Sequence, residues 1–234
     1  MESGSASGGQ SPDRRIVVLL VFLLLLGAVV AAILIARGGD DGSEPKSAGA
    51  AGCEKAEKPE PREEKLSAPP QEVRRGEELT AVVVTSCGEF SIALDTGNSP
   101  KTVNSFVYLA GKGFYDGLHF HRIVTDFVVQ GGDPKGNGEG GPGYFVDEPP
   151  PPNQAYTKGI VAMAKSAADP PGRSGSQFFV VIPADAGLSP AYAVLGRVSK
   201  GFATVERIGK AGTRSQEGIP KQTVLIDSVT IENG

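Results

Sequence analysis

The 234-residue chain contains no tryptophan, only two histidines and only two cysteines. A zinc site needs three or four closely spaced ligands, so histidines and cysteines are too few here for an ordinary one. The chain also lacks an excess of basic charge, because the formal net charge is −4 and no Lys/Arg cluster interleaved with aromatic residues occurs. We therefore expect neither a metal cofactor nor a nucleic-acid partner.

An uninterrupted apolar run, IVVLLVFLLLLGAVVAAILIA, occupies the 21 residues 16–36. As a helix rising about 1.5 Å per residue it would span roughly 30 Å, the thickness of a bilayer's hydrocarbon core. A cleaved signal peptide usually has a shorter apolar region, of about 7 to 15 residues. The run therefore predicts a transmembrane helix that acts as a signal anchor, with a cleaved signal peptide and a buried core helix as the alternatives.

Arg14 and Arg15 precede this run, whereas Arg37 follows it and is soon joined by two aspartates. Because basic residues favour the cytoplasmic side of a membrane, we expect residues 1–15 to form a short cytoplasmic tail. The rest of the chain would then lie outside the cytoplasm, attached to the cell membrane by a single span. A domain on the cytoplasmic side is the alternative orientation.

Residues 37–79 are rich in Gly, Pro, Glu and Lys and poor in apolar residues. Such a segment buries too little apolar surface to offset the entropy of ordering, so it predicts a flexible, disordered linker. Cys53 lies in this linker and Cys87 in the first expected hairpin. Outside the cytoplasm they either form a disulfide that clips the linker to the domain or remain two free thiols.

Residues 80–234 are expected to form the folded domain, in which short apolar segments alternate with turns. A helix is expected from Ser99-Pro100 to Gly111 or Gly113, and another over 202–210. Short connections favour antiparallel pairing, and a closed eight-stranded antiparallel barrel capped by two α-helices would leave no exposed edges. A β-sandwich is the alternative. The expected strands are 80–86, 87–95, 118–124, 126–132, 159–165, 176–182, 192–198 and 222–232.

Several chemical motifs are excluded. Residues 136–141, GNGEGG, have the spacing of a dinucleotide-binding loop, but Pro142 follows instead of a helix. No phosphate-binding Gly-Lys-Ser/Thr and no G-x-S-x-G nucleophile elbow occurs. We read His119 and His121 as structural residues, and expect no cofactor.

The stretch FHRIVTDFVVQGGDP, residues 120–134, places an arginine and a glutamine among apolar residues. Strand alternation would put Phe120 and Arg122 on one face, with His119 and His121 on the other. From these residues alone Arg122 is either an exposed strand residue or part of a functional site.

Several motifs occur in order: SPKTVNSFVYLA, GFYDGLHFHR, FHRIVTDFVVQGGDP, GNGEGGPGY, GIVAMAKS and GSQFFVVI. Together they resemble the cyclophilin family of peptidyl-prolyl cis-trans isomerases over about residues 80–232. With the apolar run that precedes this domain, we expect a bacterial-like, membrane-anchored member. The resemblance implies an eight-stranded antiparallel barrel with two capping helices, and isomerase activity without a cofactor. It also implies that the partners are proline-containing unfolded or extended polypeptides. We expect a monomer.

The resemblance also implies roles for individual residues. Arg122 matches the family's catalytic arginine, Phe127 its proline pocket, and Gln130 a position beside them. The substrate-binding positions would be Val128, Ala164, Lys165, Gln177, Phe179, Leu188 and Tyr192.

Four positions depart from the family's usual residues. Val128 stands where methionine is frequent, and Lys165 where asparagine is frequent. Gly187 occupies the position of a tryptophan associated with cyclosporin binding, and Tyr192 replaces a frequent histidine. These departures bear on inhibitor affinity and peptide preference but leave the arginine in place.

Rotation about an X-Pro bond breaks no covalent bond, yet it is slow because conjugation raises a barrier of about 18–20 kcal/mol. In the twisted state the proline nitrogen regains its lone pair, to which a guanidinium can donate. We therefore expect Arg122 to catalyse this rotation. We expect the protein to assist the folding of extracytoplasmic proteins in this way. The alternative function is a membrane-tethered proline-peptide binding module or holdase chaperone with little turnover.

Overall fold

The computed structural model describes Met1 and residues 52–234 of the chain. The transmembrane helix expected over 16–36 lies outside the described residues. Among the residues that are described, no helix has the length and apolar character needed to cross a bilayer.

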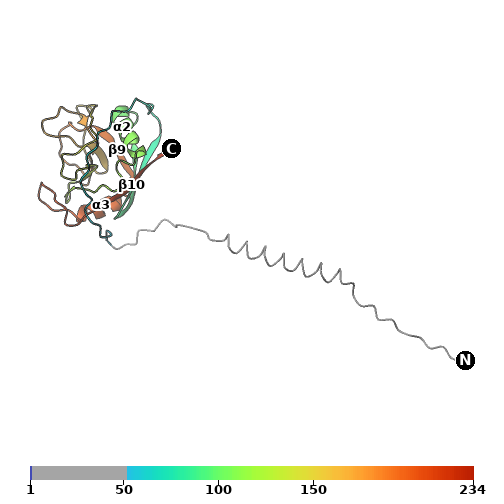
Figure 1. Ribbon diagram of the computed structural model, residues 1–234. Helices are drawn as coiled ribbons and strands as arrows, with labels where there is room; N and C mark the ends of the chain where they lie inside the picture. Colours follow the sequence, from blue (N-terminus) through green and yellow to red (C-terminus); the bar gives the residue numbers. More distant parts are fainter. Residues whose placement is uncertain (2–51) are drawn as a thin grey trace. The chain divides into compact units, whose positions relative to one another are not determined.

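An eight-stranded antiparallel sheet, ordered β10-β1-β2-β9-β6-β8-β4-β3, forms the framework of the domain. Its strands β9 and β10 are labelled in Figure 1. Each of the eight strands lies at a predicted segment, although β3 is much shorter than expected. A two-stranded ladder of β5 (Val146–Asp147) and β7 (Arg173–Ser174) was not predicted, because two-residue strands leave no periodic pattern. The bounds are β1 Leu79–Thr85, β2 Gly88–Leu94, β3 Arg122–Val124, β4 Val128–Gly131, β6 Ile160–Met163, β8 Phe178–Val181, β9 Val194–Lys200 and β10 Ile226–Asn233.

The sheet curls, and alternate residues along its strands face two different apolar clusters. The inner cluster is the main core and includes Ile123, Val129 and Phe178, all fully buried. The outer cluster contains their chain neighbours Val128 and Phe179, among others. Because successive side chains of a strand point to opposite faces, one short strand can serve the core and a surface site together.

The barrel predicted as closed does not close as a continuous ladder, because β3 and β10 are the edge strands of the sheet. Residues 117–121 precede β3 and form one isolated bridge beside the other edge strand, between His119 and Leu225. Backbone hydrogen bonds from Gly117 to Ile226 and from Phe120 to Val224 cover the remaining gap. The structure is therefore a curled open sheet, and irregular backbone of residues 117–121 lies between its two edge strands.

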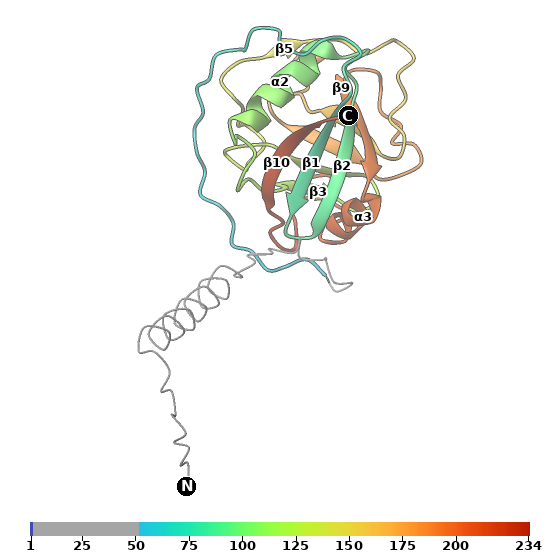
Figure 2. The ribbon, with the colours of Figure 1, turned by 90° about the vertical axis from the view of Figure 1, so that its right-hand side faces the viewer.

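Two helices lie at opposite ends of strands β10, β1 and β2 (Figure 2). They are α2, Pro100–Gly111, and α3, Phe202–Lys210, which confirms both predicted helices. Ser99 occupies the N-cap position of α2 but its side chain makes no capping hydrogen bond. Instead, the Glu148 carboxylate accepts from the backbone N–H groups of Lys101 and Thr102 at the positively polarised helix start.

Residues 52–78, which we call the N-terminal strap, lie along the domain instead of forming a flexible linker (Figure 2). Cys53 is joined to Cys87 by a disulfide, and Val73 is buried in the core. The amide of Asn104 on α2 binds three backbone groups of the strap. The linker prediction is thus wrong for residues 52–79, because a disulfide and backbone hydrogen bonds order a segment whose composition offers few apolar side chains.

We predict that Cys53→Ser lowers the free energy of unfolding by about 2 to 4 kcal/mol, because the disulfide closes a loop with a sequence separation of 34. Urea denaturation of the full chain measures this change. A thiol reductant should lower the stability of the parent to that of the variant and leave the variant unchanged. A difference below about 0.5 kcal/mol between oxidised parent and variant would contradict the prediction.

Candidate active site

The β3–β4 hairpin brings Arg122 and Gln130 into direct cross-strand register. Its turn contains Asp126 at a φ of 59°, a left-handed conformation that aspartate tolerates better than bulky residues do. On the next strand, Phe179 lies opposite Gln130. Cross-strand partners share a face of the sheet, so arginine, glutamine and phenylalanine form one row across β3, β4 and β8.

A chain of side-chain hydrogen bonds runs from this arginine to a loop. Arg122 Nη1 donates to Gln130 Oε1 at 3.3 Å, and Gln130 Nε2 donates to Gln177 Oε1 at 3.0 Å. Gln177 Nε2 then donates to the carbonyl oxygens of Gly138 at 3.0 Å and Gly140 at 2.9 Å. Since arginine can only donate and a carbonyl can only accept, both amides have one consistent orientation.

The acceptors belong to residues 133–143, which we call the glycine loop. Asp133 is 1% exposed, and its carboxylate accepts from the backbone N–H groups of Lys135, Asn137 and Gly138. A Cβ on Gly140 would lie 1.9 Å from Asp133 Oδ1, so a side chain cannot be accommodated there. The glycine-rich spacing thus shapes a loop around a buried carboxylate and turns its carbonyl groups to Gln177.

Arg122 is half-buried and has no carboxylate within 4.0 Å among residues 52–234. Its Nε donates to the carbonyl oxygen of Gln216 at 3.1 Å. Gly218 packs on its stem, where a Cβ would lie 2.8 Å from Arg122 Cγ. Burial lowers the pKa of the guanidinium, which nonetheless stays protonated in proteins. A charged group is therefore held at the edge of an apolar surface.

That apolar surface is the outer cluster, to which Phe127, Ala164, Leu188 and Tyr192 add partly buried side chains. The rings of Phe179 and Tyr192 are perpendicular, with centroids 5.3 Å apart. Such an edge-to-face contact is favourable and fixes both rings.

Tyr156 holds the backbone of Tyr192 in place. Its hydroxyl donates to the carbonyl oxygen of Tyr192 at 2.6 Å and accepts from the N–H of Tyr192 at 2.9 Å. The ring of Tyr156 is fully buried within the outer cluster. This tyrosine was not predicted as a site residue, because its contribution is a backbone contact that has no sequence signature.

Lys165 and Gly187, two of the positions that depart from the family's usual residues, differ in their surroundings. Lys165 Nζ donates to the carbonyl oxygens of Ser166 and Asp169, both at 2.8 Å, and lies 5.9 Å from the centroid of the Tyr192 ring. Gly187 has a φ of 63°, and a Cβ there would meet nothing within 4 Å. The side chain of Lys165 is thus held beside Tyr192 at the edge of the outer cluster, whereas the space around Gly187 is open.

The structure brings the predicted site residues to one surface formed by β3, β4, β8 and the segments that follow β6 and precede β9. It corrects the predicted strand alternation, because Phe120 is fully buried in the inner core while Arg122 lies on the outer face. The regular strand begins only at Arg122, so the alternation does not extend back to Phe120. Sequence reasoning missed Asp133, Gly138, Gly140, Tyr156 and Gln216; for the loop residues, the glycine spacing was the available signal.

Comparison with known proteins identifies the family of the domain that carries this surface. The family model described as cyclophilin type peptidyl-prolyl cis-trans isomerase/CLD matches residues 80–231. The chain belongs to this family. Cyclophilin-type peptidyl-prolyl cis-trans isomerase activity is what the family and its many related members have in common.

Related cyclophilins include bacterial and animal proteins. The chain is 39% identical to a probable peptidyl-prolyl cis-trans isomerase B of Mycobacterium leprae over 66% of its own length and 57% of that protein. It is 37% identical to peptidyl-prolyl cis-trans isomerase B of Streptomyces anulatus over 67% of this chain and 98% of that one. A mouse peptidyl-prolyl cis-trans isomerase-like 1 is 40% identical over 57% of this chain and 81% of its own.

A cyclophilin-type isomerase of Cryptosporidium parvum, solved in the presence of the dipeptide Ala-Pro, has the same fold. Its TM-score is 0.60 at 28% sequence identity, covering 66% of this chain and 99% of that one. The fold of this cyclophilin is therefore shared over the domain that carries Arg122.

The two histidines, His119 and His121, lie just before Arg122 in the chain and belong to no cluster of metal ligands among the described residues. Among the described residues, no group of three or more His, Cys, Asp or Glu side chains could hold a metal ion. Both ring nitrogens of His121 are buried without a hydrogen-bond partner in that part of the chain. Burial therefore lowers the pKa of His121 to about 4, so its ring stays neutral at physiological pH.

We predict that His121 makes stability fall as the pH drops from about 6.5 towards 4. The unfolded chain binds a proton in this window while the folded chain does not, so the loss reaches roughly 1 to 3 kcal/mol near pH 4. Urea denaturation at several pH values measures the slope. The variant His121→Gln should flatten it, and an unchanged slope in the variant would show that His121 is not responsible.

Proposed function

We propose that Arg122 accelerates cis-trans isomerisation by donating a hydrogen bond to the proline nitrogen of the substrate in the twisted state. The observation that carries this proposal is a half-buried guanidinium, without a carboxylate partner in residues 52–234, at the edge of an apolar cluster. Nη2 of Arg122 has no acceptor among these residues, so it is available to a ligand. A purely structural arginine would be expected to have its donors and charge satisfied.

The apolar residues around Arg122 suit the ring of a proline. Phe127, Phe179 and Leu188 would hold the pyrrolidine ring while the carbonyl side of the bond rotates. Gln130 and Gln177 would bind the peptide backbone, since their amide orientations are already set by the hydrogen-bond chain. The charge stabilises only the twisted amide, in which the lone pair is free, so it favours the transition state over both ground states.

The substrates we propose are extended or unfolded chains that contain proline. Such chains can lay an X-Pro segment across an open surface, whereas a folded protein rarely exposes one. The presence of Ala-Pro in the related Cryptosporidium structure supports a proline-containing ligand for this cyclophilin. We further propose that the chain acts as a monomer.

Replacing the arginine tests the mechanism. We expect Arg122→Ala to lower kcat/KM for an X-Pro test peptide by roughly 10²- to 10³-fold, the effect typical of removing one preorganised donor. Arg122→Lys should recover only a small part, because lysine keeps the charge but cannot reproduce the contacts to Gln216 and Gln130. The measurement is NMR exchange spectroscopy of the peptide.

Arg214→Ala is the matched control, since this exposed arginine lies in the neighbouring turn. It should retain the exchange rate of the parent. A parent that shifts the peptide resonances without accelerating exchange would instead identify a binding module or holdase, and the enzymatic role of Arg122 would be withdrawn.

We also propose that this cyclophilin is a membrane-tethered, bacterial-like enzyme that assists protein folding outside the cytoplasm. The apolar run 16–36 and the arginines before it support a single span with a cytoplasmic N-terminus. The disulfide between Cys53 and Cys87 supports the same compartment, because disulfides persist in oxidising environments and are rare in the cytosol.

The thiol state in living cells tests this location. We expect acid quenching followed by alkylation under denaturing conditions to leave Cys53 and Cys87 unmodified in the full chain, as read by mass spectrometry. The variant Cys53→Ser is the control for labelling and should take up one alkyl group, on Cys87. Two alkyl groups on the parent would place the domain in a reducing compartment.

A further inference from the structure

The N-terminal strap holds the glycine loop at both of its ends. The N–H of Arg62 donates to the carbonyl oxygen of Pro134 at 2.9 Å, and the N–H of Leu66 donates to that of Pro142 at 2.7 Å. Between these two points, Glu63 pairs with Lys135 at 3.2 Å. The strap therefore fixes the loop on either side of the two glycine carbonyls that accept from Gln177.

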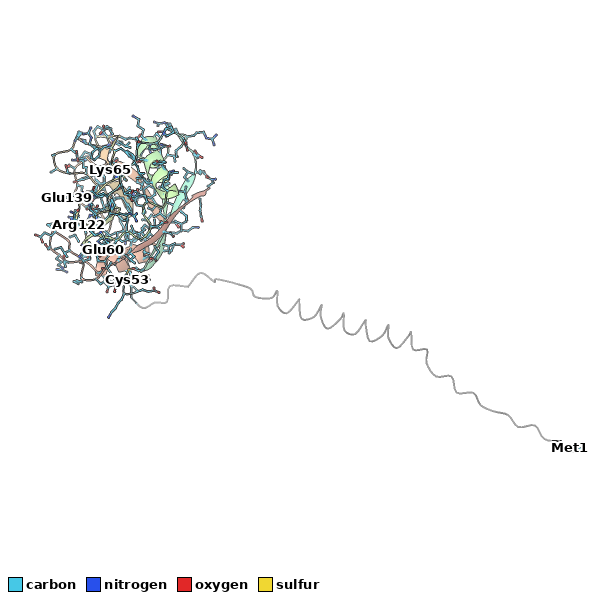
Figure 3. All side chains as sticks on the ribbon, viewed as in Figure 1. Met1, Cys53, Glu60, Lys65, Arg122 and Glu139 are labelled. Carbon is cyan, nitrogen blue, oxygen red and sulfur yellow. A yellow bond between two sulfur atoms is a disulfide. The ribbon has the colours of Figure 1, made fainter. Side chains whose placement is uncertain are left out.

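The strap is itself fastened at both ends. The disulfide to Cys87 ties its start to the β1–β2 hairpin, and Asn104 ties residues 70–73 to helix α2. In the view of Figure 3, Cys53, Glu60 and Lys65 are labelled on the same side of the domain as Arg122. The strap thus approaches the site as a stretch of chain held at its two ends.

We propose that the strap is a positioning element of the active site: by holding the glycine loop, it orients Gln177 and Gln130 for substrate binding. This inference rests on the proposed function and deepens it, because it adds residues 53–73 to a site otherwise contained within the family match over 80–231. The connection is a continuous set of contacts from strap backbone to loop backbone, and from loop carbonyls to the two glutamines.

The arginine is held by a second contact that does not depend on the strap. Arg122 Nε donates to Gln216, in the turn that precedes Gly218. Loosening the strap therefore disturbs the orientation of Gln177 and Gln130 more than the position of the guanidinium. The expected signature is a higher KM with little change in kcat, whereas a strap that only stabilises the fold would change neither below the unfolding temperature.

A matched pair of variants at one position separates the backbone hydrogen bond from the side chain. In the full chain, Leu66→Pro removes the N–H that donates to Pro142, and Leu66→Ala keeps it. Both lose the leucine side chain, which packs partly against the core. We expect Leu66→Pro to raise KM about 2- to 10-fold relative to Leu66→Ala, the range for one lost hydrogen bond, with kcat within about 2-fold.

Reducing the disulfide perturbs the strap without a mutation. A dithiol reductant transfers two electrons and two protons to Cys53 and Cys87, giving two thiols, and is itself oxidised to a cyclic disulfide. The parent should then show the same rise in KM, with shifted side-chain amide NMR signals for Gln177 and Gln130. Cys53→Ser should already show the altered values and should not respond to the reductant.

The outcomes distinguish the inference from the proposed function. A lower unfolding temperature with unchanged KM and unchanged glutamine amide signals, in both Leu66→Pro and the reduced parent, would overturn the positioning role. If the oxidised parent does not accelerate exchange, the proposed function fails, and the amide signals alone then decide whether the strap orients the two glutamines. Shifted signals under reduction would support the inference in that case too.

Discussion

Arginine can donate hydrogen bonds but cannot accept them, and this constraint at Arg122 sets the arrangement of the polar groups around it. Gln130 must present its oxygen to the guanidinium, so its nitrogen must find an acceptor, which is the oxygen of Gln177. The nitrogen of Gln177 in turn requires acceptors, which the carbonyl groups of Gly138 and Gly140 supply. The shape of the glycine loop is thus part of the environment of the arginine.

The curled sheet allows this arrangement to be built from short strands. Residues that alternate along β4 and β8 pack into the inner core on one face and line the site on the other. Phe178 and Phe179 illustrate the division, because the first contributes to the aromatic core around Tyr115 and the second contacts Tyr192. Rigid packing on the inner face therefore fixes the position of the outer one.

Much of this fold is predictable from local patterns of apolar and turn residues in the sequence. Short apolar segments bounded by turns located the eight main strands, and Ser99-Pro100 located the start of α2. The incomplete closure beside β3 was not predictable, because Leu118 and Phe120 alternate with polar residues as they would in a regular strand. The strap was missed for a different reason: composition reports apolar side chains, whereas the N–H groups of Arg62 and Leu66, which anchor it, are common to almost every residue.

The family resemblance also assigned residues to the candidate site. The resemblance named Arg122, Gln130, Gln177 and Phe179. In the structure Arg122, Gln130 and Phe179 lie in one row across β3, β4 and β8, and Gln177 is hydrogen-bonded to Gln130. Groups that act through their backbone, such as the carbonyl oxygens of Gln216 and Gly138, could not be recognised from residue type. Their contribution depends on loop conformation, which local sequence does not determine.

The covalent link between Cys53 and Cys87 also determines how mechanical force enters the domain. A pull on the chain from the N-terminal side would pass through the two sulfur atoms directly into the β1–β2 hairpin. The strap, which lies between Cys53 and strand β1, would be bypassed by this load for as long as the bond is intact. A pull on residues before Cys53 would therefore enter the sheet at the turn between β1 and β2 and leave the contacts between the strap and the glycine loop unloaded.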